Sequence, residues 1–125
     1  MAALSDYAEK LLLDYAMTAG SVTRPTAWYV ALYTGAPSDS GGGTEVSGSG
    51  YARQAVTFAA ATSGAGTTSN TNAQTFTASG GAFGTVTHIG ILDASSGGNL
   101  LWHGAMTASK TIADGDTLEF SIGNI

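Results

Sequence analysis

The N-terminal segment places a hydrophobic side chain at every third or fourth position, which is the period of one face of an α-helix. The members of this stripe are Leu4, Ala8, Leu11, Leu12 and Tyr15. Ser5 or Asp6 can cap the start of such a helix, and Gly20 can end it. The spacing therefore predicts one amphipathic helix over about residues 5–18. Its stripe must be covered either by the β-rich remainder of the chain or by a partner.

From about residue 27 onward, helical spacing gives way to short β-branched and aromatic runs separated by small polar residues. Residues 28–34, WYVALYT, are almost continuously apolar, which predicts a strand that is covered on both faces. Residues 84–93, GTVTHIGILD, form a second strong strand pattern. A turn rich in Ser and Gly separates this run from residues 100–106, so we expect the two to pair as a hairpin.

Weaker patterns predict four more strands, and one connection between them is long. These strands cover residues 51–59, 74–78, 110–113 and 117–122. Residues 60–73 are small and polar, which indicates a loop or a weak edge strand. Asp114-Gly115-Asp116 is a hairpin signal between the last two strands. One helix followed by six or seven short strands predicts a mainly β fold, an antiparallel β-sandwich or small barrel, in a single domain over residues 1–125.

Composition and charge limit the partners that such a domain can bind. Only 10% of the 125 residues are charged, and the formal net charge is -5. The four basic residues are scattered, so the chain lacks the basic footprint that nucleic acid or an anionic membrane surface requires. There is no cysteine for disulfide or thiolate chemistry. The sequence shows neither a secretory signal nor a run of about 18 apolar residues, so we expect no membrane segment.

The glycine-rich segment SGGGTEVSGSG, residues 40–50, is a candidate phosphate-binding loop. A phosphate-binding loop needs a Lys close to its last glycine and a helix directly after it. Neither Lys10 nor Lys110 is near, and the following residues, YARQAV, resemble a strand. We therefore interpret this segment as a connection between two strands, in which glycine allows positive φ angles.

Two histidines and several carboxylates are the remaining candidates for catalysis or metal binding. His88 and His103 lie in the two strands of the predicted hairpin, and Asp93 is the nearest third ligand for a metal. Both histidines share strand faces with apolar residues, so structural roles are favoured. No serine stands at a strand-to-helix nucleophile elbow, and Asp114-Gly115-Asp116 lacks the rest of a calcium loop. We predict no catalytic, cofactor-binding or metal-binding residue.

The aromatic residues are candidates for sugar binding or for core packing, and packing is favoured. Together with the helical stripe, they supply the residues expected to contact the core or a partner. These residues are Leu4, Leu11, Leu12, Tyr15, Trp28 and Trp102.

Five segments occur in an order that resembles small structural proteins of tailed bacteriophages, often described as tail-fibre-like. The segments are LSDYAEKLLLDY, WYVALYT, GGGTEVSGSGYARQAVTF, GTVTHIGILDASSGGNLLWHGAM and TIADGDTLEFSIG. The resemblance covers nearly the whole chain, and TEVSGSGYARQAV and GTVTHIGILDASSGGNLLWHGA are its most specific parts. It implies a non-enzymatic, mainly β component of the virion, assembled in the host cytoplasm, and it transfers no catalytic residue. Such chains usually continue into another short strand beyond the position of Ile125, which leaves the partner of the last strand open.

Two functions of a virion protein are compatible with these features. The first is a capsid decoration, or cement, protein: a small homo-oligomer, such as a trimer, that stabilises the shell by many modest contacts with the major coat protein. The alternative is a module of the tail tip or tail fibre that contacts other virion proteins or host glycans. An exposed Trp28 or Trp102 favours the alternative, because sugar rings stack on aromatic faces. An enzyme is a third possibility, for which the sequence offers no catalytic constellation.

Overall fold

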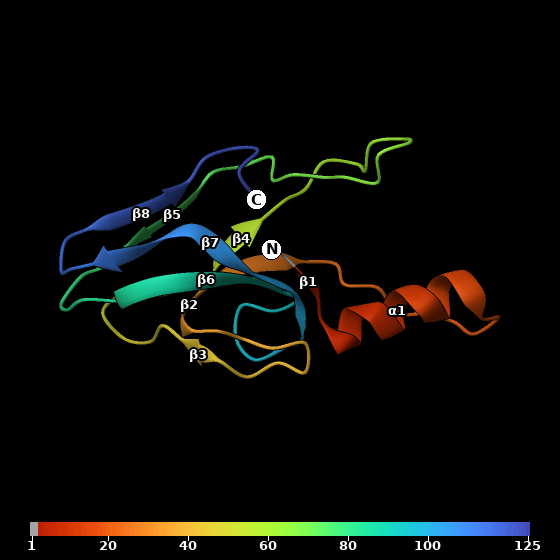
Figure 1. The fold of residues 1–125 in the computed structure, drawn as a ribbon, viewed down its shortest axis with the longest axis horizontal. Coiled ribbons are helices and arrows are strands. Elements are labelled where there is room, and N and C mark those ends of the chain that lie inside the picture. The colour runs from red at the N-terminus through yellow and green to blue at the C-terminus, as the bar shows by residue number, and fades with distance from the viewer. Residues whose placement is uncertain (1–2) are drawn as a thin grey trace.

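The computed structural model describes residues 3–125 and is mainly β. Eight strands form two antiparallel sheets, and one helix, α1 (Asp6–Met17), lies near the N-terminus. In Figure 1 the two sheets form the body of the molecule, and α1 extends from one end of it. The predicted fold class, mainly β and antiparallel with one N-terminal helix, is confirmed, and the described residues form eight strands where six or seven were predicted.

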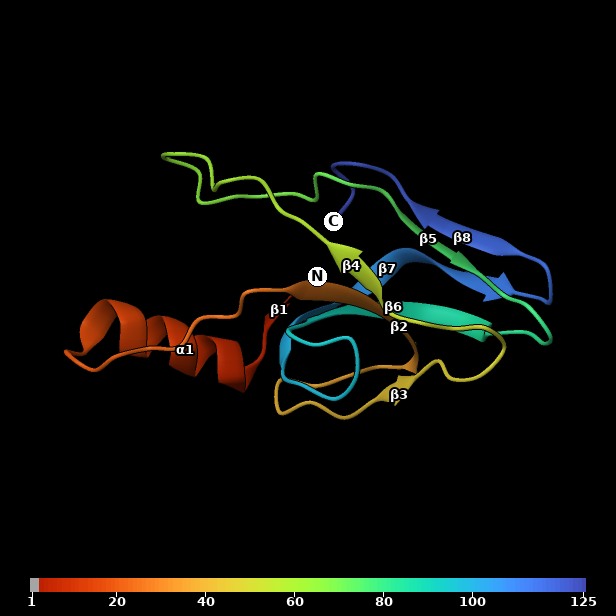
Figure 2. The ribbon, with the colours of Figure 1, turned by 180° about the vertical axis from the view of Figure 1, so that it is seen from behind.

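The larger sheet has six strands and the smaller sheet has two. The order of the larger sheet is β1-β7-β6-β2-β3, and β4 also pairs with β2. Its strands are β1 (Ala3–Leu4), β2 (Trp28–Gly35), β3 (Thr44–Glu45), β4 (Gln54–Val56), β6 (Gly84–Leu92) and β7 (Leu100–Ile112). The smaller sheet pairs β5 (Gln74–Thr77) with β8 (Thr117–Phe120). Figures 1 and 2 show this pair lying over the end of the larger sheet that is farther from α1.

The strongest sequence patterns give the three central strands. β2 and β6 match the predicted runs almost to the residue, and β6 pairs with β7 as the expected hairpin. β7 is longer than predicted, because its pairing with β6 continues to Gly84 opposite Ile112. The predicted strand at residues 110–113 is therefore the end of β7. The predicted strand at residues 51–59 is reduced to the three residues of β4.

The predicted hairpin around Asp114-Gly115-Asp116 is wrong. β8 pairs with β5, placing Leu118 opposite Phe76, and it does not pair with the end of β7. The turn is instead a corner between the two sheets, where the Gly115 amide donates a 2.9 Å hydrogen bond to the Ala78 carbonyl. The turn residues do reverse the chain, but the choice of partner strand follows from burial. Pairing with β5 places Leu118 in the core between the sheets.

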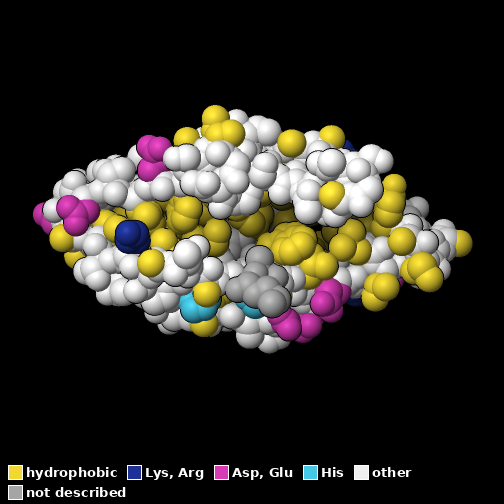
Figure 3. Space-filling view, turned by 45° about the horizontal axis from the view of Figure 1, so that its top comes forward, with side chains coloured by type: hydrophobic (Ala, Val, Ile, Leu, Met, Phe, Trp, Pro, Cys, Tyr) yellow, Lys and Arg dark blue, Asp and Glu magenta, His cyan; other side chains and the backbone are white. Residues whose placement is uncertain are grey.

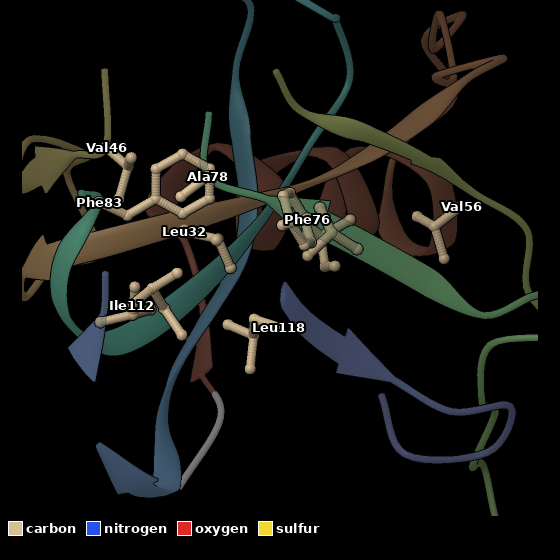
Figure 4. Packing of buried hydrophobic residues seen from close by; sticks show 11 residues of the cluster. Leu32, Val46, Val56, Phe76, Ala78, Phe83, Ile112 and Leu118 are labelled. Atoms are coloured by element: carbon tan, nitrogen blue, oxygen red, sulfur yellow. The ribbon is translucent and has the colours of Figure 1, made fainter. Parts of the chain in front are cut away.

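The main hydrophobic core lies between the two sheets. Figure 4 shows side chains from both layers meeting there. The labelled members are Leu32, Val46, Val56, Phe76, Ala78, Phe83, Ile112 and Leu118. The ring of Tyr51 stacks on Phe76 with centroids 6.1 Å apart and meets Phe83 edge-on at 5.7 Å. Offset-stacked and edge-on pairs of this kind add to the stabilisation that burial provides.

A second, smaller cluster covers the other face of the larger sheet. It contains Ala31, Tyr33, Leu92 and Leu100. Gly90 lies directly beneath it, and a Cβ atom there would come within 2.9 Å of both the Tyr33 ring and Leu100. Burial on both faces of β2 confirms what its continuous apolar run predicted.

The glycine-rich segment is a connection between strands, as predicted. It connects β2 to β4, but it also contains the two-residue strand β3, which pairs with β2 and was not predicted. Gly43 has φ of 79°, and a Cβ atom there would lie 2.8 Å from the Gly35 carbonyl oxygen. Only glycine avoids that backbone contact while keeping the positive φ angle.

Candidate functional site

The base of α1 is fixed firmly to the larger sheet. Ser5 is its N-cap, and the Ser5 hydroxyl accepts a 3.1 Å hydrogen bond from the Ala8 amide. The same hydroxyl donates to the Leu100 carbonyl of β7. The Asp6 amide donates a 2.9 Å hydrogen bond to the Asp39 carbonyl, in the loop that follows β2. These contacts fix the direction in which the helix leaves the body.

Two details of the helix differ from the sequence prediction. Leu4 precedes the helix and lies in β1, opposite Trp102 of β7, so it is not part of the helical stripe. The helix ends at Met17 with Thr18 as its C-cap, before Gly20 is reached. The Thr18 hydroxyl donates a 2.8 Å hydrogen bond to the Asp14 carbonyl, which satisfies an acceptor at the helix end.

Most of the apolar stripe of α1 is exposed in the chain. We call Ala8, Leu11, Leu12 and Tyr15 the helix face, because they share one side of the helical wheel. Only Ala8 is buried; Leu11 is half-buried, Leu12 is 51% exposed and Tyr15 is 78% exposed. Of the two kinds of coverage expected for this stripe, the β-rich remainder provides its own only for the first turn, because α1 runs away from both sheets (Figures 1 and 2). Coverage by a partner remains a prediction.

At 12 residues, α1 is also too short to cross a lipid bilayer, and residues 3–125 contain no other helix that could.

A groove opens on the inner side of the larger sheet, beside the region that β5 and β8 cover. Its volume is about 750 Å³. The floor comes from β2, β6 and β7, where Ile91 lies directly opposite Trp102. The loop after β4 and the C-terminal residues form the opposite wall. Figure 3 shows hydrophobic side chains lining a hollow between the two layers.

The lining of the groove is apolar and lacks acidic, lysine and arginine side chains among the described residues. Its large apolar members are Trp28, Phe58, Ile89, Ile91, Leu101, Trp102 and Ile125. Trp28 packs partly against the main core, whereas Trp102 is 46% exposed. The prediction that the tryptophans pack in the core is therefore correct in part for Trp28, which is partly buried there, and wrong for Trp102. Neither tryptophan would have been assigned to a common groove from sequence, because the groove forms only when distant segments meet.

The histidines and Asp93 do not converge on a common point. His88 lies opposite Ala105, and its Nδ1 is 2.8 Å from the Thr87 hydroxyl. The Nε2 of His103 is 2.8 Å from Asp39 Oδ1. Asp93 accepts a 2.6 Å hydrogen bond from the backbone amide of Asn99, the residue before β7. Within residues 3–125, no three His, Cys, Asp or Glu side chains form a group that could hold a metal ion.

A polar cluster of Glu45, Tyr51 and Arg53 lies at the outer edge of β2, and we call it the polar clamp. The guanidinium of Arg53 forms a bidentate ion pair with the Glu45 carboxylate, and both N–O distances are 2.8 Å. Its third nitrogen donates to the carbonyls of Ala94 and Gly97 at 2.8 and 2.7 Å. One side chain thereby joins β3 and the segment before β4 to the turn between β6 and β7.

The Tyr51 hydroxyl completes the polar clamp. It donates a 2.9 Å hydrogen bond to Glu45 Oε1 and accepts one of 3.0 Å from the Leu32 amide. Leu32 lies in the part of β2 between its contacts with β4 and β3, so the hydroxyl replaces a missing strand neighbour.

The pKa shifts in this region follow from burial and from the ion pair. Burial alone would raise the pKa of Glu45, but hydrogen bonds from Arg53 and Tyr51 and the Arg53 charge lower it on balance. The hydrogen bond with Glu45 raises the pKa of Arg53, and burial raises the pKa of Tyr51. Shifted pKa values are typical of catalytic sites, but also of structural ion pairs. Here Arg53 and Glu45 bind each other and the backbone, which favours a structural role.

Sequence reasoning missed the polar clamp although all three residues stand in the segment TEVSGSGYARQAV. A signal was present, because an acidic and a basic residue flank a glycine-rich turn at positions 45 and 53. The target of Arg53, two backbone carbonyls some forty residues away, left no trace in the sequence pattern.

Comparison with protein-family models gives a match over residues 3–125 to the family described as podophage GP4 fiber I protein gp80. A search of curated proteins gives no match.

Proposed function

The chain belongs to the family of the podophage GP4 fiber I protein gp80, and from this premise we propose that it attaches to other fibre or tail components through apolar surfaces. Membership makes it a structural component of the virion, of fibre type. The finer proposal is that it is a non-enzymatic module of the fibre or tail tip. It would be held in place by the helix face and the groove.

The observation that carries this proposal is the pair of uncovered apolar surfaces. Leu12 and Tyr15 project from a helix that leaves the body, and Trp102 is half-exposed in the groove. Burying one large apolar side chain completely contributes about 1.5–3 kcal/mol. A few such side chains, covered together at one contact, are enough to hold a small subunit on a particle that presents many binding positions.

A capsid decoration role, with the major coat protein as partner, is the second candidate. The same apolar surfaces favour it, since a cement protein must cover parts of several coat subunits at once. The two-layer body also favours it, because residues 3–125 contain no elongated shaft of the kind that extends a fibre away from the particle.

Host-glycan contact through the groove is favoured by the exposure of Trp102. The lining argues against it, because Thr67, Thr68, His103 and Asn124 are its few polar side chains and His103 already binds Asp39. Sugar sites need several polar groups that fix the hydroxyls in addition to an aromatic face.

Copy number in purified particles tests the choice between fibre and capsid. Quantitative mass spectrometry against the major coat protein would measure it directly. A copy number close to that of the tail proteins supports the fibre module. A copy number that approaches that of the coat protein would contradict it and favour decoration, and absence from the particle would refute both.

A further inference from the structure

We propose that the groove of one copy receives the helix face of a second copy of this chain, so that copies join head to tail. This inference rests on the proposed function, which it deepens by naming one partner for both apolar surfaces. It assigns Leu12 and Tyr15 of one copy to the space lined by Trp28, Ile91 and Trp102 of the next.

The two surfaces match in chemistry. The described lining of the groove carries no acidic, lysine or arginine side chain. The helix face is likewise uncharged, because the charged residues Glu9 and Lys10 lie on other sides of α1. A helix that presents an apolar face can therefore enter the groove while its charged side stays in water. A basic or acidic partner would leave its charges without counterparts there.

The helix does not fill the groove of its own chain. Among the described residues that line the groove, none belongs to α1. The hydrogen bonds of Ser5 to β7 and of Asp6 to the Asp39 carbonyl hold the base of the helix, and α1 extends away from the sheets (Figure 1). A neighbouring copy is free of this constraint.

The size of the contact is suited to assembly of several copies. A helix of 12 residues is about 18 Å long and about 10 Å wide, so half of its lateral surface is about 300 Å². One such contact is too small for a stable pair. A copy that gives its helix to one neighbour and its groove to another covers about 600 Å² of its own surface over two contacts, so the stability of the assembly comes from several contacts acting together.

Symmetry explains why a second copy is the partner favoured here. Each copy carries one helix face and one groove, and these are different surfaces, so the contact is of the heterologous type. Contacts of this type close into a ring when the rotation between copies allows it. Every helix face and every groove in such a ring is covered without a further protein.

The test is the mass of the purified chain in solution, measured by sedimentation velocity over a range of concentrations. We expect an oligomer for the wild type and a monomer for Leu12→Asp, which places a charge in the groove. Leu13→Asp is the matched control, because Leu13 is 61% exposed, adjacent in sequence and on the opposite side of the helix. It should leave the oligomer unchanged. Far-ultraviolet circular dichroism confirms that each variant is folded.

A groove variant separates this arrangement from helix-to-helix contact. Trp102→Glu, or Ala105→Glu if the first fails to fold, should also give a monomer, because both residues line the groove. If the groove variants stay oligomeric, the inference is overturned.

The failure of this inference differs from failure of the proposed function. A wild-type chain that is monomeric in solution but present in particles would refute the helix-in-groove contact between copies and keep the virion role. An oligomer that is absent from particles would refute the virion role and keep the contact.

Discussion

Replacing Arg53 with methionine should destabilise the fold more than its position near the surface suggests. Arg53→Met keeps most of the aliphatic stem and removes the guanidinium, and with it four hydrogen bonds of 2.7–2.8 Å. The Glu45 carboxylate then loses its counter-charge, and the turn between β6 and β7 loses its link to the polar clamp.

The magnitude follows from the burial of the two partners. Removing one partner of a fully buried ion pair costs about 3–5 kcal/mol, because the other charge is left uncompensated. Arg53 is 9% exposed but Glu45 is 27% exposed, so water can partly solvate the remaining carboxylate. We therefore expect a loss near the lower end, about 3 kcal/mol in the free energy of unfolding. For a chain of 125 residues this corresponds to a fall in Tm of about 10 °C.

Urea unfolding followed by tryptophan fluorescence measures this loss, and Lys10→Met is the control. Lys10 pairs with Asp14 one helical turn away, but the pair is exposed, so its loss should cost no more than about 0.5 kcal/mol. A loss below about 1 kcal/mol for Arg53→Met would refute the reasoning, since the ion pair would then contribute no more than an exposed one.

Three further outcomes follow from the same structure. Folding lowers the pKa of Glu45, so the stability that this carboxylate contributes is present above its unfolded pKa of about 4.3 and is lost as pH falls through the folded pKa. Acid unfolding followed by circular dichroism should therefore show a smaller loss of stability for Glu45→Gln than for the wild type. Equal losses would contradict the lowered pKa. Phe76→Ala should lower the free energy of unfolding in urea by about 3–5 kcal/mol, because this fully buried ring lies against Tyr51 in the main core. A loss below about 1 kcal/mol would show that the core collapses around the gap. At a concentration low enough for the wild type to be monomeric, Leu12→Asp should leave the Tm of the chain nearly unchanged, because Leu12 is exposed in the single chain. A large fall would show that the helix face contributes to the fold as well as to assembly.

The strands that sequence predicted best are those whose signal is local. β2 and β6 are long runs rich in β-branched or aromatic residues, and the burial of β2 on both faces follows from its continuous apolar run. Pairing between distant strands has no such signal. β8 follows a turn that resembles a hairpin, and only the position of Leu118 in the core decides that it joins β5.

The sequence indicated candidate packing or partner-contact residues but not their arrangement in space, and their contact with a partner stays a prediction. The sequence singled out Leu11, Leu12, Tyr15, Trp28 and Trp102 as contact residues, and the structure divides them between the helix face and the groove. Helical periodicity indicates that a face is apolar, but it does not indicate what covers it. The groove exists because the smaller sheet has two strands and the larger has six, and that mismatch follows from the pairing of the whole chain.

The outer edge of β2 bears on how such a protein behaves when many copies are crowded together. A long, straight strand edge invites pairing with the edge of another molecule and so leads to aggregation. In this chain β4 takes the first part of the edge, β3 takes the last, and the Tyr51 hydroxyl occupies the amide between them. The edge is divided into pieces too short to template a foreign strand. Copies that are crowded on a growing particle can therefore contact one another through their side chains without pairing their strands.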